Sequence, residues 1–212
     1  MQQLLLDIRP AARPGLANFI PGPNRELLGQ IRKWLAGETA ETALYIWGPP
    51  GSGKTHLLHA LAAEAGAALW DGNGEIARDT PLVAVDDVEK LDEPAQIAVF
   101  DAYNRAKAAG QRFIAAGENA PASLKLREDL RTRLGWGLVY RIHPLSDADM
   151  QAALSKHAQA LGFELDPAIA NWLLTRKSRN LGYLLQIVEA LDRYSLQTRR
   201  RITLPLLKEI LP

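Results

Sequence analysis

The chain has 212 residues, which suits one domain with a small addition, and 47% of them are hydrophobic, enough for a substantial core. The formal net charge is +1, so the chain lacks the overall basic field typical of proteins that bind nucleic acid through charge. Cysteine is absent, which excludes disulfides and thiolate sites. No stretch predicts a membrane span or a signal peptide, so we expect a cytoplasmic protein.

Apolar periodicity predicts an α/β domain in the first two thirds of the chain. A helical pattern at residues 23–36 comes first, and short apolar runs then alternate with further helical patterns. The expected strands are 44–47, 67–71, 82–86, 112–116 and 138–142, and the expected helices are 54–65, 93–109 and 122–133. This alternation predicts a five-stranded parallel sheet with helices on both faces.

From Pro144 onward the pattern is helical only. Ser146 is the expected N-cap of a helix at 147–161, Gly162 its expected stop, and Pro167 the first residue of the next helix. Two more helices are expected at 181–198 and 204–211. We therefore predict three parts, which are a tail at residues 1–9, an α/β base at 10–143 and a small helical lid at 144–212.

One motif lies between the first expected strand and its helix. Residues 48–55 read GPPGSGKT and match the P-loop pattern G-x-x-x-x-G-K-[ST] at every fixed position. The glycines let backbone N–H groups surround phosphates, and the lysine would reach the β- and γ-phosphates. We therefore expect ATP or ADP to bind here. The predicted nucleotide-binding residues are Gly48, Pro49, Pro50, Gly51, Ser52, Gly53, Lys54, Thr55 and the adjoining His56.

A second motif offers the carboxylates that a P-loop needs for its metal ion. The apolar run 82–85 ends in Asp86 and Asp87, at the carboxyl end of an expected strand, where open α/β sheets bind their ligands. The hydroxyl of Thr55 and the carboxylate of Asp86 would hold Mg²⁺, and Asp87 would orient the attacking water.

With these motifs in place, the chain resembles the AAA+ modules of the DnaA family over essentially its whole length. Residues 130–138, LRTRLGWGL, resemble the arginine-finger segment of that family, and residues 191–211 look like the C-terminus of its Hda-type regulators. Asn18-Phe19 resembles the entry to the adenine pocket, which adds Phe19 to the nucleotide-binding set. The resemblance implies that Arg133 is a finger that acts in trans on a neighbour's γ-phosphate. Arg131 is the weaker candidate.

The first residues carry a separate resemblance. The peptide QLLLDI at residues 3–8 is similar to the one by which Hda-like proteins dock on the β sliding clamp of DNA polymerase III. The alternative is a strand that pairs with the chain's own sheet, and the DnaA-like body favours docking. The clamp-binding residues implied are Gln3, Leu4, Leu6 and Ile8. Because no helix-turn-helix pattern follows the lid, we expect DNA to be reached indirectly through the clamp, and direct contact with DNA stays open.

Two positions depart from the family pattern. After the fourth expected strand, either Glu118 or Asn119 falls where the polar sensor residue is expected. In the lid, Gly182 stands where the resemblance places the sensor-two arginine, and Arg179 lies three residues earlier as a candidate substitute. The departure puts independent ATP turnover in doubt and leaves nucleotide binding intact.

The sequence therefore predicts an Hda-like regulator of replication initiation, which docks on the clamp and stimulates hydrolysis of ATP bound to DnaA. Such a protein is an activator more than an enzyme, with weak turnover of its own. The alternative is an autonomous AAA+ ATPase of the helicase-loader type. A DNA-binding module is disfavoured by the charge balance. Homo-oligomer formation stays open.

Overall fold

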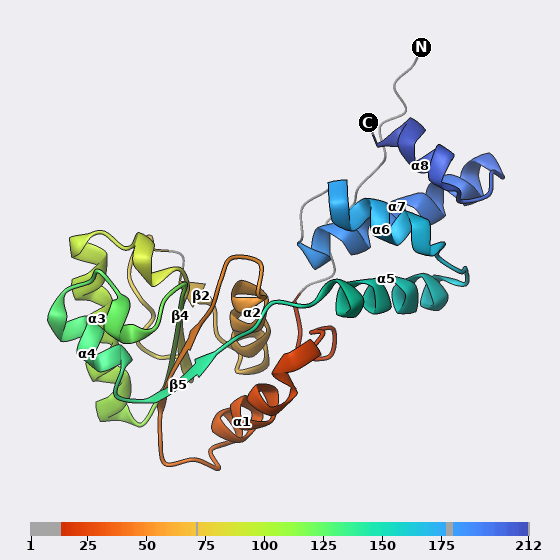
Figure 1. The fold of residues 1–212 in the computed structure, drawn as a ribbon. Coiled ribbons are helices and arrows are strands. Elements are labelled where there is room, and N and C mark those ends of the chain that lie inside the picture. The colour runs from red at the N-terminus through yellow and green to blue at the C-terminus, as the bar shows by residue number, and fades with distance from the viewer. Residues whose placement is uncertain (1–13, 71, 177–179, 212) are drawn as a thin grey trace. The chain divides into compact units, whose positions relative to one another are not determined.

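The computed structural model describes residues 14–70, 72–176 and 180–211. The chain divides into two compact units that meet in the sequence between Pro144 and Leu145. The first is an α/β base and the second contains only helices (Figure 1).

The base is built on a five-stranded sheet with the order β2-β3-β4-β1-β5, in which all pairs are parallel. This architecture confirms the predicted fold class. Because the strands are parallel, the carboxyl ends of the three central ones meet at one edge of the sheet, where loops can form a site. The strands are β1 (Ala43–Trp47), β2 (Leu69–Trp70), β3 (Leu82–Val85), β4 (Arg112–Gly117) and β5 (Leu138–Arg141).

Helices cover both faces of this sheet, with α1 and α2 on one side and α3 and α4 on the other (Figure 1). The base contains α1 (Arg25–Ala36), α2 (Lys54–Glu64), α3 (Glu93–Ala109) and α4 (Glu128–Leu134), and the 3₁₀ turns η1 (Gly22–Asn24), η2 (Val88–Lys90) and η3 (Pro121–Ser123).

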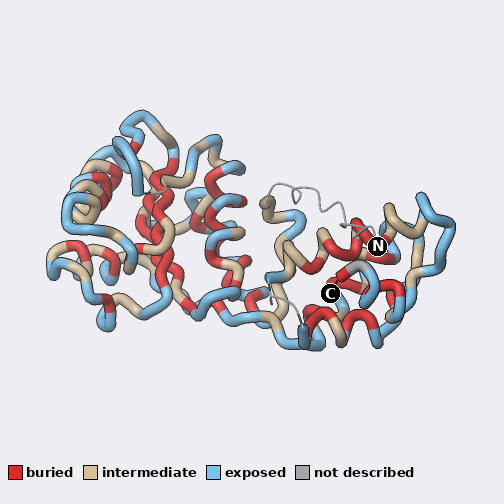
Figure 2. The backbone as a smooth tube through the Cα atoms, turned by 90° about the horizontal axis from the view of Figure 1, so that it is seen from above, coloured by how far each residue is buried: buried red, intermediate tan, exposed pale blue. Residues whose placement is uncertain are grey.

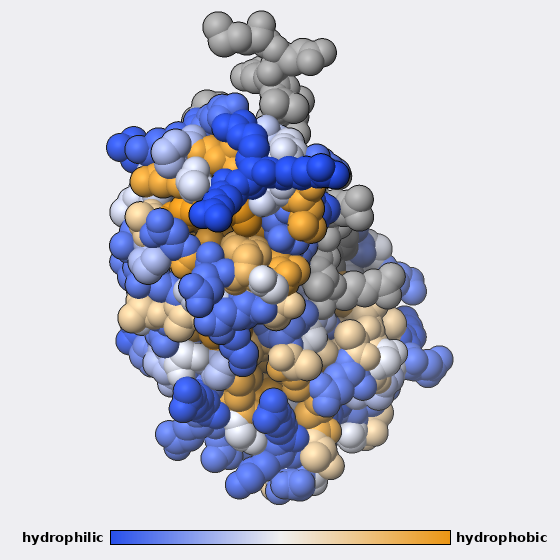
Figure 3. Space-filling model, turned by 90° about the vertical axis from the view of Figure 1, so that its right-hand side faces the viewer, coloured by the Kyte–Doolittle hydropathy of each residue, from blue (hydrophilic) through white to orange (hydrophobic). Residues whose placement is uncertain are grey.

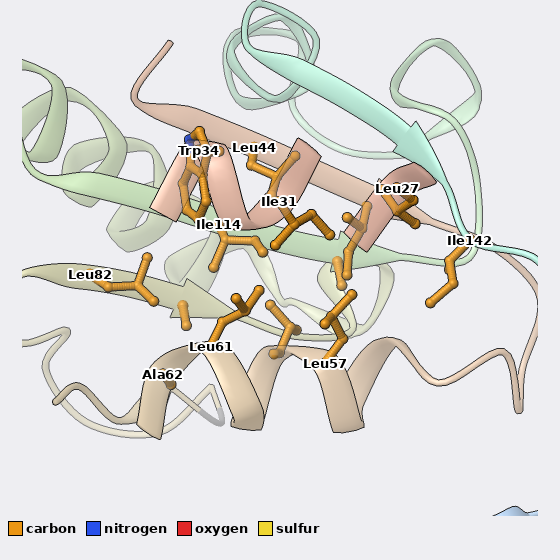
Figure 4. Close-up of a cluster of buried hydrophobic side chains, with 14 of the residues drawn as sticks. Leu27, Ile31, Trp34, Leu44, Leu57, Leu61, Ala62, Leu82, Ile114 and Ile142 are labelled. Carbon is orange, nitrogen blue, oxygen red and sulfur yellow. The ribbon is translucent and has the colours of Figure 1, made fainter. Parts of the chain in front are cut away.

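The alternation of side chains along the strands divides the core of the base into two layers. Leu44 and Ile46 of β1 pack with α1 and α2, whereas Tyr45 packs with α3 and α4. In the close-up of the first layer, side chains of α1 such as Ile31 and of α2 such as Leu57 converge on those of the strands (Figure 4). Buried residues accordingly follow the strands and the inner sides of the helices (Figure 2).

The predicted helix at 122–133 is wrong in its first half. Residues 121–123 form the 3₁₀ turn η3, and α4 begins only at Glu128. In between, Leu124 is extended and buried in the core, and the N–H of Arg127 donates to the Oε1 of Gln96 on α3 at 2.9 Å. Tertiary packing against α3 therefore outweighs the local helical pattern.

The predicted strand at 67–71 is also too long, because β2 contains only Leu69–Trp70. The N–H of Ala67 instead donates to the carbonyl of Ala62 at 2.7 Å, after Gly66 turns the chain with a φ of +68°. These residues close the end of α2, so they are unavailable to the strand.

The second unit consists of four helices with their own buried core of leucine, isoleucine and valine side chains. Ser146 caps the first of them with a capping box, and Gly162 ends it in the left-handed conformation, as predicted. The helices are α5 (Asp147–Leu161), α6 (Pro167–Arg176), α7 (Leu181–Thr198) and α8 (Leu204–Ile210).

The surface carries both apolar and hydrophilic residues, as the composition of the chain leads one to expect. On the face drawn in Figure 3, apolar residues form several patches that are separated by hydrophilic ones. Within the described parts of the chain, no helix is both long and apolar enough to cross a membrane.

Candidate nucleotide-binding site

The P-loop leaves the carboxyl end of β1 and turns into α2. Gly51 and Gly53 have φ values of +76° and +98°, a conformation that favours glycine. Gly48 has no room for a side chain, because a Cβ there would lie 2.9 Å from the Cγ2 of Ile142. Its N–H donates to the carbonyl of Gly117 at 3.2 Å. The loop is therefore held between the end of β4 and the residue after β5.

Lys54 and Ser52 are the polar side chains buried in this loop. Lys54 is 6% exposed, and its Nζ donates to the carbonyls of Gly48 at 2.8 Å and Pro49 at 3.2 Å. Ser52 is 5% exposed, and its Oγ has no hydrogen-bond partner among the described residues. Buried polar atoms without partners are costly, so a phosphate oxygen bound in this loop would satisfy the hydroxyl. The residues present thus fit a nucleotide.

The structure brings the P-loop and the end of β3 together. The Oγ1 of Thr55 donates to the Oδ2 of Asp86 at 2.5 Å, although 31 residues separate them in sequence. The N–H of Asp87 donates to the other oxygen of Asp86 at 2.8 Å and fixes the orientation of that carboxylate. Hydroxyl and carboxylate oxygens are suitable ligands for Mg²⁺ beside nucleotide phosphates.

Asp87 adopts a left-handed conformation with a φ of +46° at the start of η2. Its carboxylate accepts a hydrogen bond from the Nζ of Lys90 at 2.5 Å, which raises the pKa of that lysine. Both residues line a cleft of about 420 Å³ together with Asp86 and Trp70. The structure therefore places Asp87 beside the predicted metal ligand, in an ion pair that sequence reasoning did not foresee.

The two sensor candidates follow β4 and have exposed side chains. The backbone N–H groups of Glu118 and Asn119 both donate to the Oε1 of Glu89, at 2.6 and 3.0 Å. The hydroxyl of Tyr45 donates to the carbonyl of Asn119 at 2.8 Å, and burial followed by the charge of Glu89 raises the pKa of Tyr45, which keeps the hydroxyl protonated.

Sequence reasoning missed Glu89. It lies two residues beyond Asp87, so its carboxylate connects the turn after β3 to the loop after β4. The closeness of Glu89 to Asp86 and Asp87 in the sequence could have indicated a role near the site. The sequence of a turn, however, does not show which distant loop its side chain contacts.

The segment before α1 packs on the start of α2. Phe19 lies 3.2 Å from the position that a Cβ on Gly53 would take, and its ring meets that of His56 edge-on at 5.5 Å. The Nε2 of His56 lies 3.0 Å from the Oδ1 of Asn18 and 3.3 Å from the carbonyl of Gly15. Both partners are acceptors, so this nitrogen carries the proton. Burial is the main reason that the pKa of His56 is lower than the usual value for histidine.

Arg133 belongs to α4 and therefore to the face of the sheet opposite α2. Its guanidinium lies 4.1 Å from the ring centre of Trp136 and 5.7 Å from that of Phe100. The P-loop leads into α2, which packs on the other face of the sheet. The structure thus separates this arginine from the nucleotide-binding cluster of its own chain.

The remaining predicted residues can be located only in part. Gly182 is the second residue of α7, after the N-cap Asn180 and Leu181. Arg179, Gln3, Leu4, Leu6 and Ile8 lie outside the described residues.

Two family models match this chain. Residues 44–120 match the ATPase family associated with various cellular activities, AAA, and residues 147–211 match the lid domain of Hda. The first match covers β1 to β4 with the P-loop and both aspartates, and the second covers the helical unit.

Solved structures share the fold. DnaA from Aquifex aeolicus, bound to AMPPCP, superposes with a TM-score of 0.68 at 22% identity, over 91% of this chain and 71% of that one. Domain III of Thermotoga maritima DnaA superposes with a TM-score of 0.73 at 20% identity, over 96% of this chain and 100% of that one. The Thermotoga maritima RuvB Holliday junction branch migration motor superposes with a TM-score of 0.63 at 19% identity, over 96% of this chain and 72% of that one.

The parallel sheet, the P-loop and the Thr55–Asp86 pair define an AAA+ protein with a nucleotide-binding fold. Within this class, the chain shares its fold with DnaA, and the match of residues 147–211 makes it similar to Hda, with an Hda-type lid. The resemblance stated from the sequence is thereby confirmed.

Proposed function

We propose that this protein is an Hda-like regulator of replication initiation. It binds ADP or ATP with Mg²⁺ in its P-loop, docks on the β sliding clamp through residues 3–8, and stimulates hydrolysis of ATP bound to DnaA. The backbone N–H groups of the P-loop and the side chain of Lys54 would hold the phosphates, and a bound metal ion would shield their charge. DnaA returns to its ADP form as a result.

The match of residues 147–211 to the Hda lid domain carries this proposal, because it distinguishes the chain from AAA+ proteins in general. Two features of the structure support it. Gly182 offers no side chain for the sensor-two role, which disfavours efficient turnover by this chain. Arg133 forms no ion pair with any carboxylate in the described part of the chain, so the terminal N–H groups of its guanidinium are available to a phosphate on another protein.

One observation favours the alternative of an autonomous ATPase. The hydroxyl of Thr55 and the carboxylate of Asp86 are hydrogen-bonded, and Asp87 follows directly, so the groups expected for metal binding and water activation are all present. The rate of ATP turnover by the isolated chain discriminates between the two functions.

The deciding experiment measures conversion of DnaA-bound ATP to ADP on clamp-loaded DNA, with wild-type protein or Arg133→Ala. We expect the variant to lose stimulation, since a finger of this type contributes roughly 10³- to 10⁵-fold in rate. Arg131→Ala is the matched control, because Arg131 lies on the same helix but faces Glu128 at 3.9 Å. Full stimulation by Arg133→Ala would refute the proposal, and brisk turnover by the isolated wild-type chain would favour the autonomous ATPase.

A further inference from the structure

Trp136 is an exposed tryptophan that two cations share. It follows α4 and is 55% exposed. The guanidinium of Arg133 lies 4.1 Å from its ring centre, and the Nζ of Lys107, from the last turn of α3, lies 5.2 Å from it. An aromatic ring at these distances attracts cations through its quadrupole.

The backbone holds this tryptophan in place. The N–H of Trp136 donates to the carbonyl of Arg133 at 3.1 Å. The next residue, Gly137, lies so close to β1 that a Cβ would approach the carbonyl carbon of Ala43 to 2.7 Å. Trp136 is therefore anchored to the sheet although its ring is exposed, and a rigid ring can orient a neighbouring side chain.

The other arginines of this region are held differently. Arg127 pairs with Asp129 at 2.9 Å, and Arg131 lies 3.9 Å from Glu128. Neither Arg133 nor Lys107 pairs with a carboxylate anywhere in residues 14–70, 72–176 and 180–211. The Nε of Arg133 is buried without a hydrogen-bond partner in the same ranges.

This difference has a chemical consequence. A salt bridge occupies the N–H groups at the edge of a guanidinium, whereas an aromatic ring contacts its face. The cation–π contact with Trp136 thus orients Arg133, and the terminal N–H groups of the guanidinium remain for the paired oxygens of an incoming anion. Lys107 supplies a second positive charge near the same ring.

We propose that Arg133, Trp136 and Lys107 form one phosphate-binding surface, which receives the triphosphate of a nucleotide held by a second protein. Trp136 is the positioning residue for Arg133, and Lys107 attracts the phosphate charge. This inference rests on the proposed function for the role of Arg133 and adds the two residues that support it.

The test compares Trp136→Leu with Trp136→Phe in the assay of DnaA-bound ATP hydrolysis on clamp-loaded DNA. Leucine is apolar but has no ring, so we expect the maximal stimulated rate to fall about 2- to 30-fold, the range of a cation–π contact. Phenylalanine keeps a ring face and should restore much of the rate. The half-saturating concentration of the chain should change little in either variant.

Lys107→Ala tests the second charge. We expect it to raise the half-saturating concentration about 1.5- to 5-fold and to make it less dependent on salt, as for a charge at the rim of an interface. Lys33→Ala, an exposed lysine in the last turn of α1 on the opposite side of the sheet, is the control.

The outcomes separate this inference from the function on which it rests. If Arg133→Ala keeps full stimulation, the proposed function fails and the surface fails with it. If Arg133→Ala is inactive while Trp136→Leu and Lys107→Ala match the wild type, only this inference is overturned. Equal losses of the maximal stimulated rate in Trp136→Leu and Trp136→Phe would also overturn it. They would indicate that the size and shape of tryptophan matter and that a ring face alone is not enough. Thermal unfolding of each variant excludes loss of the fold as the cause.

Discussion

At the scale of single residues, Lys54 combines burial with two hydrogen bonds to its own loop. Its amine lies against the carbonyls of Gly48 and Pro49, so the charge is confined to the turn that would surround a phosphate. A bound phosphate would face an amine that is already in position, and little side-chain entropy would be lost on binding.

Lys54→Ala should weaken nucleotide binding. The loss of one charge-assisted contact corresponds to about 1.5–3 kcal/mol, or roughly a 10- to 150-fold increase in Kd for ADP. Titration with fluorescent ADP measures this change. Lys125→Ala, an exposed lysine outside the loop, serves as the control. An unchanged Kd for Lys54→Ala would mean that the P-loop does not bind nucleotide.

His56 gives the fold a dependence on pH. Burial is the main cause that lowers its pKa, the charge of His59 adds to the effect, and the hydrogen bond to Gly15 opposes it. The unfolded chain therefore takes up this proton more readily than the folded one. The stability that the neutral ring contributes is complete above about pH 6.5 and is lost as the pH falls toward the lower folded pKa.

His56→Gln should make unfolding less sensitive to acid, because glutamine keeps an N–H donor for Asn18 and Gly15 but does not titrate. Below pH 6.5, the slope of the unfolding free energy against pH should differ between wild type and variant by at most about 1.4 kcal/mol per pH unit. Urea unfolding at pH 7.5 and 5.5 of both proteins measures it. Identical pH profiles would show that His56 is not responsible.

At the scale of elements, two glycines show that packing decides whether a glycine is needed, although the residue type is the same. Gly29 lies inside α1, exposed, with no atom within 4 Å of the position of a Cβ. Gly137 precedes β5, where a Cβ would lie 2.7 Å from the carbonyl carbon and 2.9 Å from the Cβ of Ala43. The first glycine is dispensable, whereas the second allows β5 to pair with β1.

The same substitution should therefore have opposite effects at these positions. Gly29→Ala should stabilise the protein by about 0.5–1 kcal/mol, because alanine favours the helix. Gly137→Ala should destabilise it by roughly 1–3 kcal/mol, since the sheet must shift to admit the methyl group. Urea unfolding of both variants measures the two changes, and a stable Gly137→Ala would contradict the close approach of the strands.

At the scale of the whole molecule, the proposed function assigns nucleotide binding, activation of DnaA and clamp docking to different parts of the chain. The base contains the P-loop and the Arg133 surface, and the second unit has its own core. The proposed docking peptide at residues 3–8 lies outside the described residues. Deletion and substitution of its residues test this role.

Deletion of residues 1–8 should abolish binding to the sliding clamp and change the thermal unfolding temperature by no more than about 2 °C, the effect of a small loss of stability. Gln3→Ala combined with Leu6→Ala should mimic the deletion, whereas Gln2→Ala should not. A pull-down with the clamp measures binding. Collapse of the fold on deletion would instead indicate a strand of the sheet.

The sequence by itself determined the fold class, the P-loop and the carboxylate at the end of β3. These features depend on hydrophobic periodicity and on motifs in which neighbours along the chain make the site, so they can be read locally. The caps at Ser146 and Gly162 were predictable for the same reason, because each acts on the adjoining helix turn.

Only the tertiary structure decided which distant residues meet. The contact of Glu89 with the loop after β4 and the approach of Lys107 on α3 to the ring of Trp136 after α4 depend on how the loops leave the sheet. The late start of α4 has the same origin, since burial of Leu124 against α3 outweighs its local helical pattern. Packing energies act between elements, so no window along the sequence contains them.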